Sequence, residues 1–235
     1  MDLKGLKLTW LGHATFRVHT TDGKTVIFDP FLKDNPKCPE NEKAQKQVDY
    51  MVISHGHGDH TADAVELARK HKPKVVGMIE LCAWLNRKGI ETCLPMNKGG
   101  SQQVDKLKVV MVHAEHSSSV EDDGQLIYTG DPAGIIVQFE NGVKIYHAGD
   151  TCVFSDMALI HEIYQPDLAL LPIGDHFTMG PKEAAVACRL LQPKAVVPMH
   201  YGTWPLLTGT PAAFKKELAG QKIEVIEMKP GQTIG

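Results

Sequence analysis

Short runs of apolar residues that alternate with polar ones occupy the first part of the chain. Such alternation is typical of β-strands with one buried face. Three runs, at residues 6–10, 16–20 and 25–28, follow this pattern. They are joined by Gly12-His13 and by Asp22-Gly23, the second of which is a hairpin turn signal. The sequence therefore predicts that the chain opens with a β-meander.

Beyond residue 50, strand-like runs alternate with segments of helical periodicity. A helix is predicted over 61–71 with Thr61 as its N-cap, and another over 80–88 that ends at Gly89. Further helices are predicted over 155–164, 181–191 and 211–218. The remaining strands are predicted at 50–53, 74–78, 91–94, 102–104, 108–113, 134–139, 143–147, 168–171, 195–198 and 223–228.

The order of these elements predicts the fold class. A group of strands followed by alternating strands and helices occurs twice, which indicates two similar halves. Strands that alternate with helices are typical of sheets covered by helices. We therefore expect an α/β fold, a four-layer α/β/β/α sandwich with two sheets face to face. Its 235 residues are enough for one large core, and we expect a single domain over 1–235.

The composition of the chain limits the expected location of the protein in the cell and the kinds of partner that it can bind. The net charge is −3, and no basic run is long enough to follow a phosphate backbone, so we expect no nucleic acid partner. No apolar run reaches the roughly 18 residues of a membrane-spanning helix. The first residues lack the apolar core of a signal peptide. The five cysteines are scattered, which favours reduced thiols. We expect a cytoplasmic protein without a membrane partner.

The segment from His55 to His60, with the sequence HGHGDH, carries the strongest chemical signal. Four of its six residues are metal-ligand types, and it directly follows a predicted buried strand. Alternation along an extended backbone places His55 and His57 on one side, where both can bind one cation. The glycines let the chain turn, so that Asp59 and His60 can bind a second cation. Imidazole and carboxylate ligands suit zinc first, and also manganese or iron.

Three more candidate ligands follow predicted strands. His116 comes after the strand at 108–113, Asp150 after the one at 143–147, and His200 after the one at 195–198. Loops at strand ends can converge on one site while the strands hold them in place. Asp29 also ends a predicted strand, and it is either an acceptor that holds a ligand histidine or a turn residue.

With these residues in place, the chain resembles the metallo-β-lactamase superfamily over its whole length. Segments such as WLGH at 10–13, FDPF at 28–31 and HAGDT at 147–151 are similar to the metal-dependent hydrolases close to the ascorbate-6-phosphate lactonases. The resemblance implies that His55, His57 and His116 bind one divalent ion, that Asp59, His60 and His200 bind another, and that Asp150 bridges both. Zinc leads, with manganese, nickel or iron as alternatives.

The resemblance also implies a metal-dependent hydrolase in which the dinuclear site activates a bridging hydroxide. The expected substrate is a small phosphodiester, a phosphorylated lactone or a related ester, and phosphodiesterase activity is slightly preferred because two cations offset phosphate charge. The alternatives are a nuclease of the ribonuclease Z type and a non-catalytic metal-binding scaffold. We expect a small-molecule substrate as the partner, and the sequence leaves a homo-oligomer open.

Three residues are candidates for roles in catalysis. Asp59 is one of them in addition to being a ligand. His13 lies in a turn that is close to the site in the similar hydrolases, and a contact with substrate or ligands competes with a structural role. His176 follows the strand predicted at 168–171 and could donate a proton to the leaving group.

Overall fold

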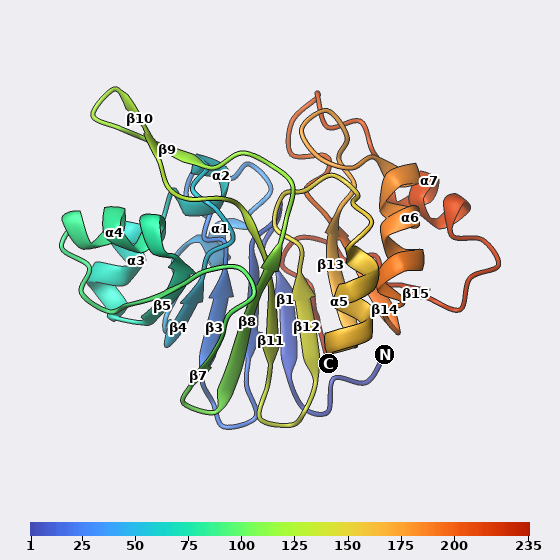
Figure 1. Cartoon of the computed structure of the whole chain (residues 1–235), viewed down its shortest axis with the longest axis horizontal. Helices are drawn as coiled ribbons and strands as arrows, with labels where there is room; N and C mark the ends of the chain where they lie inside the picture. Colours follow the sequence, from blue (N-terminus) through green and yellow to red (C-terminus); the bar gives the residue numbers. More distant parts are fainter.

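Two mixed sheets lie face to face in the computed structural model, which describes residues 1–235, and helices cover their outer faces (Figure 1). This is the predicted α/β/β/α layering. Strands at the centre of the sheets, such as β4 (Tyr50–Val52), β13 (Leu168–Pro172) and β14 (Ala195–Met199), are buried at every position. Continuous burial is expected for strands that are covered on both faces.

The first sheet contains strands from both ends of the chain. The meander β1 to β3 is antiparallel, and β3 to β6 are parallel to one another. The strand order is β16 (Thr233–Ile234), β1 (Lys7–Trp10), β2 (Phe16–His19), β3 (Thr25–Phe28), β4, β5 (Lys74–Met78) and β6 (Cys93–Met96).

The second sheet repeats this plan. Its strands β12 to β15 are parallel, and β7, β8 and β11 are antiparallel to their neighbours. The strand order is β15 (Glu224–Val225), β14, β13, β12 (Lys144–His147), β11 (Ala133–Gln138), β8 (Leu107–His113) and β7 (Ser101–Val104). The larger hydrophobic cluster joins residues of both sheets, among them Leu8 and Ile135, so the main core lies between the two sheets.

The helices lie on the outside. They are α1 (Glu40–Lys43), α2 (Gly58–Thr61), α3 (Ala64–His71), α4 (Ile79–Arg87), α5 (Met157–Tyr164), α6 (Pro181–Leu191) and α7 (Pro211–Glu217). A second cluster of buried residues, which includes Ile160, Ala184 and Phe214, packs α5, α6 and α7 against the second sheet. None of the helices combines the length and the apolar character that crossing a bilayer requires.

The structure corrects some of the predicted elements. The helix predicted over 61–71 is two helices, α2 and α3. Thr61 belongs to α2 and is not an N-cap, because its hydroxyl donates to the carbonyls of Gly56 and His57. The strand predicted at 223–228 is shorter and covers only Glu224–Val225. Helix α1, strand β16 and a separate hairpin of β9 (Ser119–Asp122) and β10 (Gln125–Tyr128) were not predicted.

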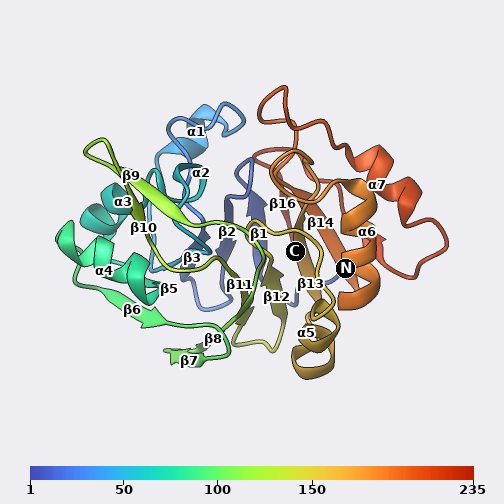
Figure 2. The ribbon, with the colours of Figure 1, turned by 45° about the horizontal axis from the view of Figure 1, so that its top comes forward.

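The loops that carry the candidate ligands meet at one end of the sandwich (Figures 1 and 2). The HGHGDH segment follows β4, and the loops with His116, Asp150 and His200 follow β8, β12 and β14. Because the strands that precede these loops all run toward this end, residues that are far apart in the sequence come together there.

Candidate metal centre

The HGHGDH segment changes from extended chain to helix within a few residues. Gly56 is required because a Cβ there would lie 2.1 Å from the Thr129 hydroxyl oxygen. Helix α2 then begins at Gly58 and carries Asp59 and His60 toward the site. The Thr61 hydroxyl donates to two carbonyls of the same segment and fixes this turn. This one rigid segment therefore carries four of the candidate ligands.

The first group of candidate ligands consists of His55, His57 and His116, whose donor atoms all lie within 4.8 Å of one another. The Nε2 atom of His55 lies 3.1 Å from Nδ1 of His57. Two ligand atoms on a tetrahedral zinc with bonds of about 2.0–2.1 Å are separated by about 3.3 Å. The spacing of these two nitrogens thus fits one shared cation.

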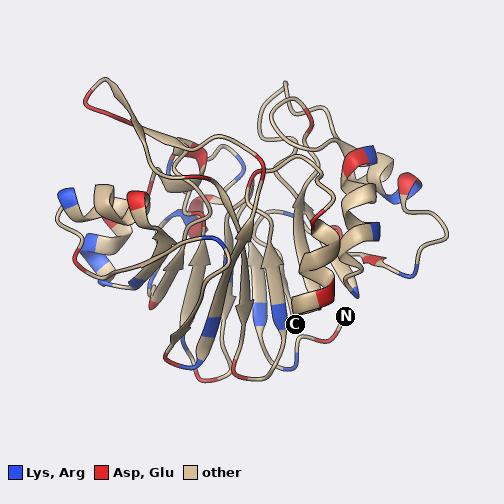
Figure 3. Cartoon of the chain, viewed as in Figure 1, with Lys and Arg blue, Asp and Glu red and all other residues tan.

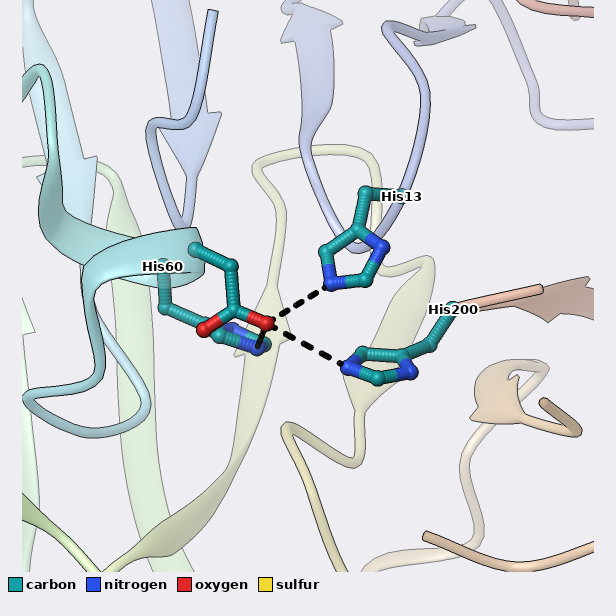
Figure 4. A group of neighbouring side chains, drawn as sticks. His13, His60 and His200 are labelled. Carbon is teal, nitrogen blue, oxygen red and sulfur yellow. Dashed lines mark hydrogen bonds and ion pairs between the residues drawn. The ribbon is translucent and has the colours of Figure 1, made fainter. Parts of the chain in front are cut away.

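The second group consists of His13, Asp59, His60 and His200, again with donor atoms within 4.8 Å of one another. Figure 4 shows the rings of His13, His60 and His200 converging on one carboxylate, which is that of Asp59. The Asp59 Oδ2 atom lies 2.9 Å from His13 Nε2, 3.6 Å from His200 Nε2 and 3.9 Å from His60 Nε2. The other carboxylate oxygen of Asp59 makes no hydrogen bond within the protein.

Asp150 lies between the two groups. Its Oδ2 atom is 3.1 Å from His200 Nε2 and 3.6 Å from His116 Nε2, and its Oδ1 atom is 3.2 Å from His60 Nε2. Asp150 therefore faces one histidine of the first group and two of the second. Asp150 thus lies close to both groups, and its role as a bridge stays a prediction.

The donor set passes a test of its fit to metal ions. Nε2 of His60, Nε2 of His200 and Oδ1 of Asp150 are buried and make no hydrogen bond. His60 Nε2 lies 3.2 Å from Asp150 Oδ1 and His200 Nε2 lies 3.1 Å from Asp150 Oδ2, but neither contact has the geometry of a hydrogen bond. Buried polar atoms are almost always hydrogen-bonded, and a cation between these groups would satisfy all three. Imidazole nitrogens and carboxylate oxygens are the ligands that zinc, manganese, iron and nickel accept.

Opposite charges shift the pKa values of this site in the protein without metal. Burial alone would lower the pKa of His200, but the carboxylates of Asp150 and Asp59 outweigh burial and raise it to about 9. The pKa of His60 is also raised well above its usual value, because three carboxylates outweigh the effect of its burial. Burial and the neighbouring His200 lower the pKa of His13 to about 4, so its ring is neutral at pH 7.

Asp29 accepts hydrogen bonds that hold the candidate ligand histidines. Of the two roles that the sequence left open, an acceptor or a turn residue, the structure supports the acceptor. Its Oδ2 atom accepts hydrogen bonds from Nδ1 of His60 at 2.7 Å and from the hydroxyl of Ser54 at 2.6 Å. The Ser54 hydroxyl has one hydrogen and gives it to Asp29, so Nδ1–H of His55, at 2.9 Å, must donate to the Ser54 oxygen. Both histidines thereby keep Nε2 free for a cation, as is usual for metal ligands.

Several residues of the site have unusual backbone angles. His13, Asp29 and His200 have φ values of 55°, 44° and 55°, in the left-handed region that residues other than glycine rarely adopt. Conformations of this kind cost on the order of 1–3 kcal/mol each and cluster at functional sites. The surrounding core holds all three residues in place, since each is essentially buried.

The remaining candidates differ in position. His13, buried in the second group, touches Asp59 and Thr203. His176 lies on an exposed loop, its ring packs edge-on against Phe177, and it makes no side-chain hydrogen bond. It does not belong to either ligand group, and its role as a proton donor stays a prediction.

Two supporting residues were missed from the sequence. Ser54 connects Asp29 to His55, and Thr203 contacts His13 at 2.8 Å across 190 residues of sequence. Serine and threonine are common everywhere, so neither residue type is a signal. Their positions directly before His55 and just after His200 are the only indication that the sequence offers.

Comparison with known proteins agrees with this geometry. The family model described as the beta-lactamase superfamily domain matches residues 24–201. A metal-dependent hydrolase of the UPF0173 family from Koribacter versatilis is 54% identical over 233 residues, 99% of each chain. A relative from Methanopyrus kandleri with the same description is 44% identical and covers 97% of this chain and 99% of its own length.

Solved structures give the same result. The structure of Igni18, a metallo hydrolase from Ignicoccus hospitalis, is 36% identical, covers 97% of both chains and superposes with a TM-score of 0.86. An isothiocyanate hydrolase from Delia radicum gut bacteria is 19% identical with a TM-score of 0.71, and it shows the fold alone. The chain therefore belongs to the beta-lactamase superfamily, as a metal-dependent hydrolase with the metallo-β-lactamase fold.

Proposed function

We propose that the chain hydrolyses a small ester with two divalent cations held side by side. The first would bind to His55, His57 and His116, the second to Asp59, His60 and His200, and Asp150 would contact both. The position of Asp150 carries this proposal, because its two oxygens face histidines of both groups at 3.1–3.6 Å. When bound, such a pair acidifies a water molecule and polarises a phosphoryl or acyl oxygen of the substrate.

The side chains around the ligands have separate tasks. Asp29 and Ser54 fix the tautomers of His60 and His55. His13 donates from Nε2 to Asp59 Oδ2 and thereby orients that carboxylate. The Asp59 side chain is 25% exposed, and its Oδ1 atom is free to accept the proton of the attacking water. His176, exposed on its loop, is the candidate donor to the leaving group.

A small phosphodiester remains the preferred substrate, and a phosphorylated lactone or a related ester is the alternative. The geometry gives no support to a ribonuclease Z-type nuclease, because the β9–β10 hairpin beside the site carries Glu121, Asp122 and Asp123 and no basic residue. A polyanion would be repelled there. In a non-catalytic scaffold, neither the free oxygen of Asp59 nor the exposed His176 would have a function.

Reconstitution tests this proposal. Metal-free protein is loaded with zinc, manganese, nickel or iron and assayed on bis(p-nitrophenyl) phosphate, p-nitrophenyl carboxylates and simple lactones. We expect about two ions per chain and turnover of at least one ester class. Asp150→Ala should lose both ions and all turnover, while Asp156→Ala, an exposed position on the surface, keeps both. Full turnover of Asp150→Ala, or ion binding without turnover of any ester, would refute the proposal.

A further inference from the structure

The β9–β10 hairpin stands at the same end of the molecule as the ligand loops and projects beyond the sheets (Figures 1 and 2). Its register pairs Val120 with Ile127 and Glu121 with Leu126. Side chains alternate across a strand, so Val120 and Ile127 share one face, and Leu126 and Tyr128 share the other. The hairpin therefore has two faces of different character.

The face with Val120 and Ile127 fastens the hairpin to the protein. Val120 is buried, and Ile127 packs against the main core. Asp122, on the same face, accepts hydrogen bonds from Trp84 Nε1 at 2.8 Å and from the Lys88 ammonium, both on or next to α4. The hairpin is thus held in one orientation, and this orientation determines where its other face points.

The other face exposes two large apolar side chains. Leu126 is 78% exposed and Tyr128 is 64% exposed. Both line an open cavity of about 370 Å³. The other lining residues are Ser119, Gly130, Asp131, Pro132 and the loop residues His116 to Ser118. This volume is at the lower end of the roughly 300–1,000 Å³ of small-molecule sites. Since His116 is a candidate metal ligand, the cavity continues directly from the proposed reaction centre.

The lining of this cavity offers no unpaired positive charge that would bind an anion. No lysine or arginine lines it, and the hairpin carries none (Figure 3). Asp131 is its only carboxylate, and Glu121 lies opposite Leu126 on the same face of the hairpin. The Asp131 carboxylate accepts hydrogen bonds from Tyr128 at 2.7 Å and from Lys98 at 2.9 Å, which fixes the tyrosine ring as one wall.

We propose that this cavity binds an uncharged, apolar substituent of the substrate, an alkyl or aryl group, while the scissile bond lies at the metal ions. This inference rests on the proposed function and narrows its substrate class. The lining has no cation to bind a second phosphate or carboxylate on that side, so a phosphorylated lactone is disfavoured against a neutral ester, a lactone or a phosphodiester with an apolar arm. Leu126 and Tyr128 are specificity residues and take no part in bond breaking.

Hydroxamates test the proposal without turnover, because their metal-binding group stays constant while the substituent varies. Binding of aceto-, butyro-, hexano- and benzohydroxamate to the zinc-loaded protein is measured by calorimetry. Burial of one methylene tightens binding roughly two- to fourfold. We expect the dissociation constant to fall by this factor per methylene up to hexanohydroxamate. Succinohydroxamate, which ends in a carboxylate, should bind more weakly than butyrohydroxamate.

Matched variants locate the effect. Leu126→Gln combined with Tyr128→Asn changes two exposed side chains, so the fold should be retained. We expect this variant to bind acetohydroxamate like the wild type but to lose the dependence on chain length. Leu159→Gln, which changes a side chain that is 48% exposed on the outer face of α5, should retain that dependence.

Each outcome has a distinct meaning. Equal binding of all hydroxamates, or a chain-length dependence that the double variant preserves, would overturn the apolar site and leave the proposed function intact. Failure of every hydroxamate, acetohydroxamate included, would refute the metal centre and with it both proposals. If the double variant changed only the oligomeric state in sedimentation, the hairpin face would be a contact between copies of the chain, which also overturns the inference.

Discussion

Replacement of His13 by alanine probes how the second cation is held. The imidazole is fully buried and neutral at pH 7, so it has one N–H to donate. Asp59 can only accept, so Nε2 carries this hydrogen, and the Thr203 hydroxyl donates to Nδ1. His13→Ala would leave the Asp59 carboxylate free to rotate and the Thr203 hydroxyl without its partner. The ligand itself would remain.

The magnitude follows from these contacts. Loss of a group that orients a metal ligand typically weakens metal binding 10- to 100-fold. We expect this loss for the second ion only, because His55, His57 and His116 have no contact with His13. Thr203→Val keeps the shape of the side chain and removes one hydrogen bond, so its effect should lie at the lower end of that range. His13→Gln retains an N–H donor and should recover part of the affinity.

The assay is a titration of metal-free protein with zinc in competition with a chromophoric chelator, which resolves the two binding steps. His161→Ala serves as the control, because His161 lies on α5 and its ring makes one hydrogen bond, to the Leu191 carbonyl. Melting temperatures show whether the variants are folded. The reasoning would be refuted if His13→Ala bound the second ion with unchanged affinity, or if it lost the first ion instead.

Four further outcomes follow from the site. His116→Ala should lose the first ion selectively and His60→Ala the second, and a titration in which both variants lose the same ion would contradict the assignment of ligands. In the metal-free protein, the raised pKa of His200, about 9 against 6.5, stabilises the fold fully below pH 6.5, and this contribution disappears as the pH rises through 9. The melting temperature of the metal-free protein should therefore fall over that pH range. Zinc binding at pH 7 should release protons from His200 and His60, and calorimetry in buffers of different ionisation enthalpy detects this release. Zinc binding without proton release would contradict the raised pKa values. His176→Ala should keep both ions while turnover of substrates with poor leaving groups falls on the order of 10²- to 10⁴-fold, and wild-type turnover would make His176 an ordinary loop residue.

The sequence was sufficient for the layers of the fold and for the expectation that the candidate ligands lie at one end of it. Its apolar periodicity located nearly every strand, and each candidate ligand followed a strand end. Strands that run toward one end of a sandwich bring their following loops together, so the convergence of His55, His116, Asp150 and His200 could be expected. Thr61 was misassigned because a hydroxyl before an apolar run favours an N-cap, and its actual bonds run back to Gly56 and His57.

Other features depended on contacts that no local pattern encodes. The tautomer of His55 is fixed through Ser54 by Asp29, and His13 meets Thr203 from the other end of the chain. The β9–β10 hairpin did have a local signal, since Asp123-Gly124 between short apolar runs favours a tight turn. No element was predicted for residues 119–128, and the contacts of Val120 and Ile127 with the core show why the hairpin is ordered.

Because the candidate ligands come from both sheets, the supply of metal affects how much of the protein stays folded. His55, His57 and His60 follow a strand of the first sheet, and His116, Asp150 and His200 follow strands of the second. Under the proposed function, ions held between them would bind the folded chain much more tightly than the unfolded one. At free metal 100-fold above the dissociation constant, each such site adds about 2.7 kcal/mol to the free energy of unfolding. A cell short of metal would therefore lose this protein to proteases, not merely its activity.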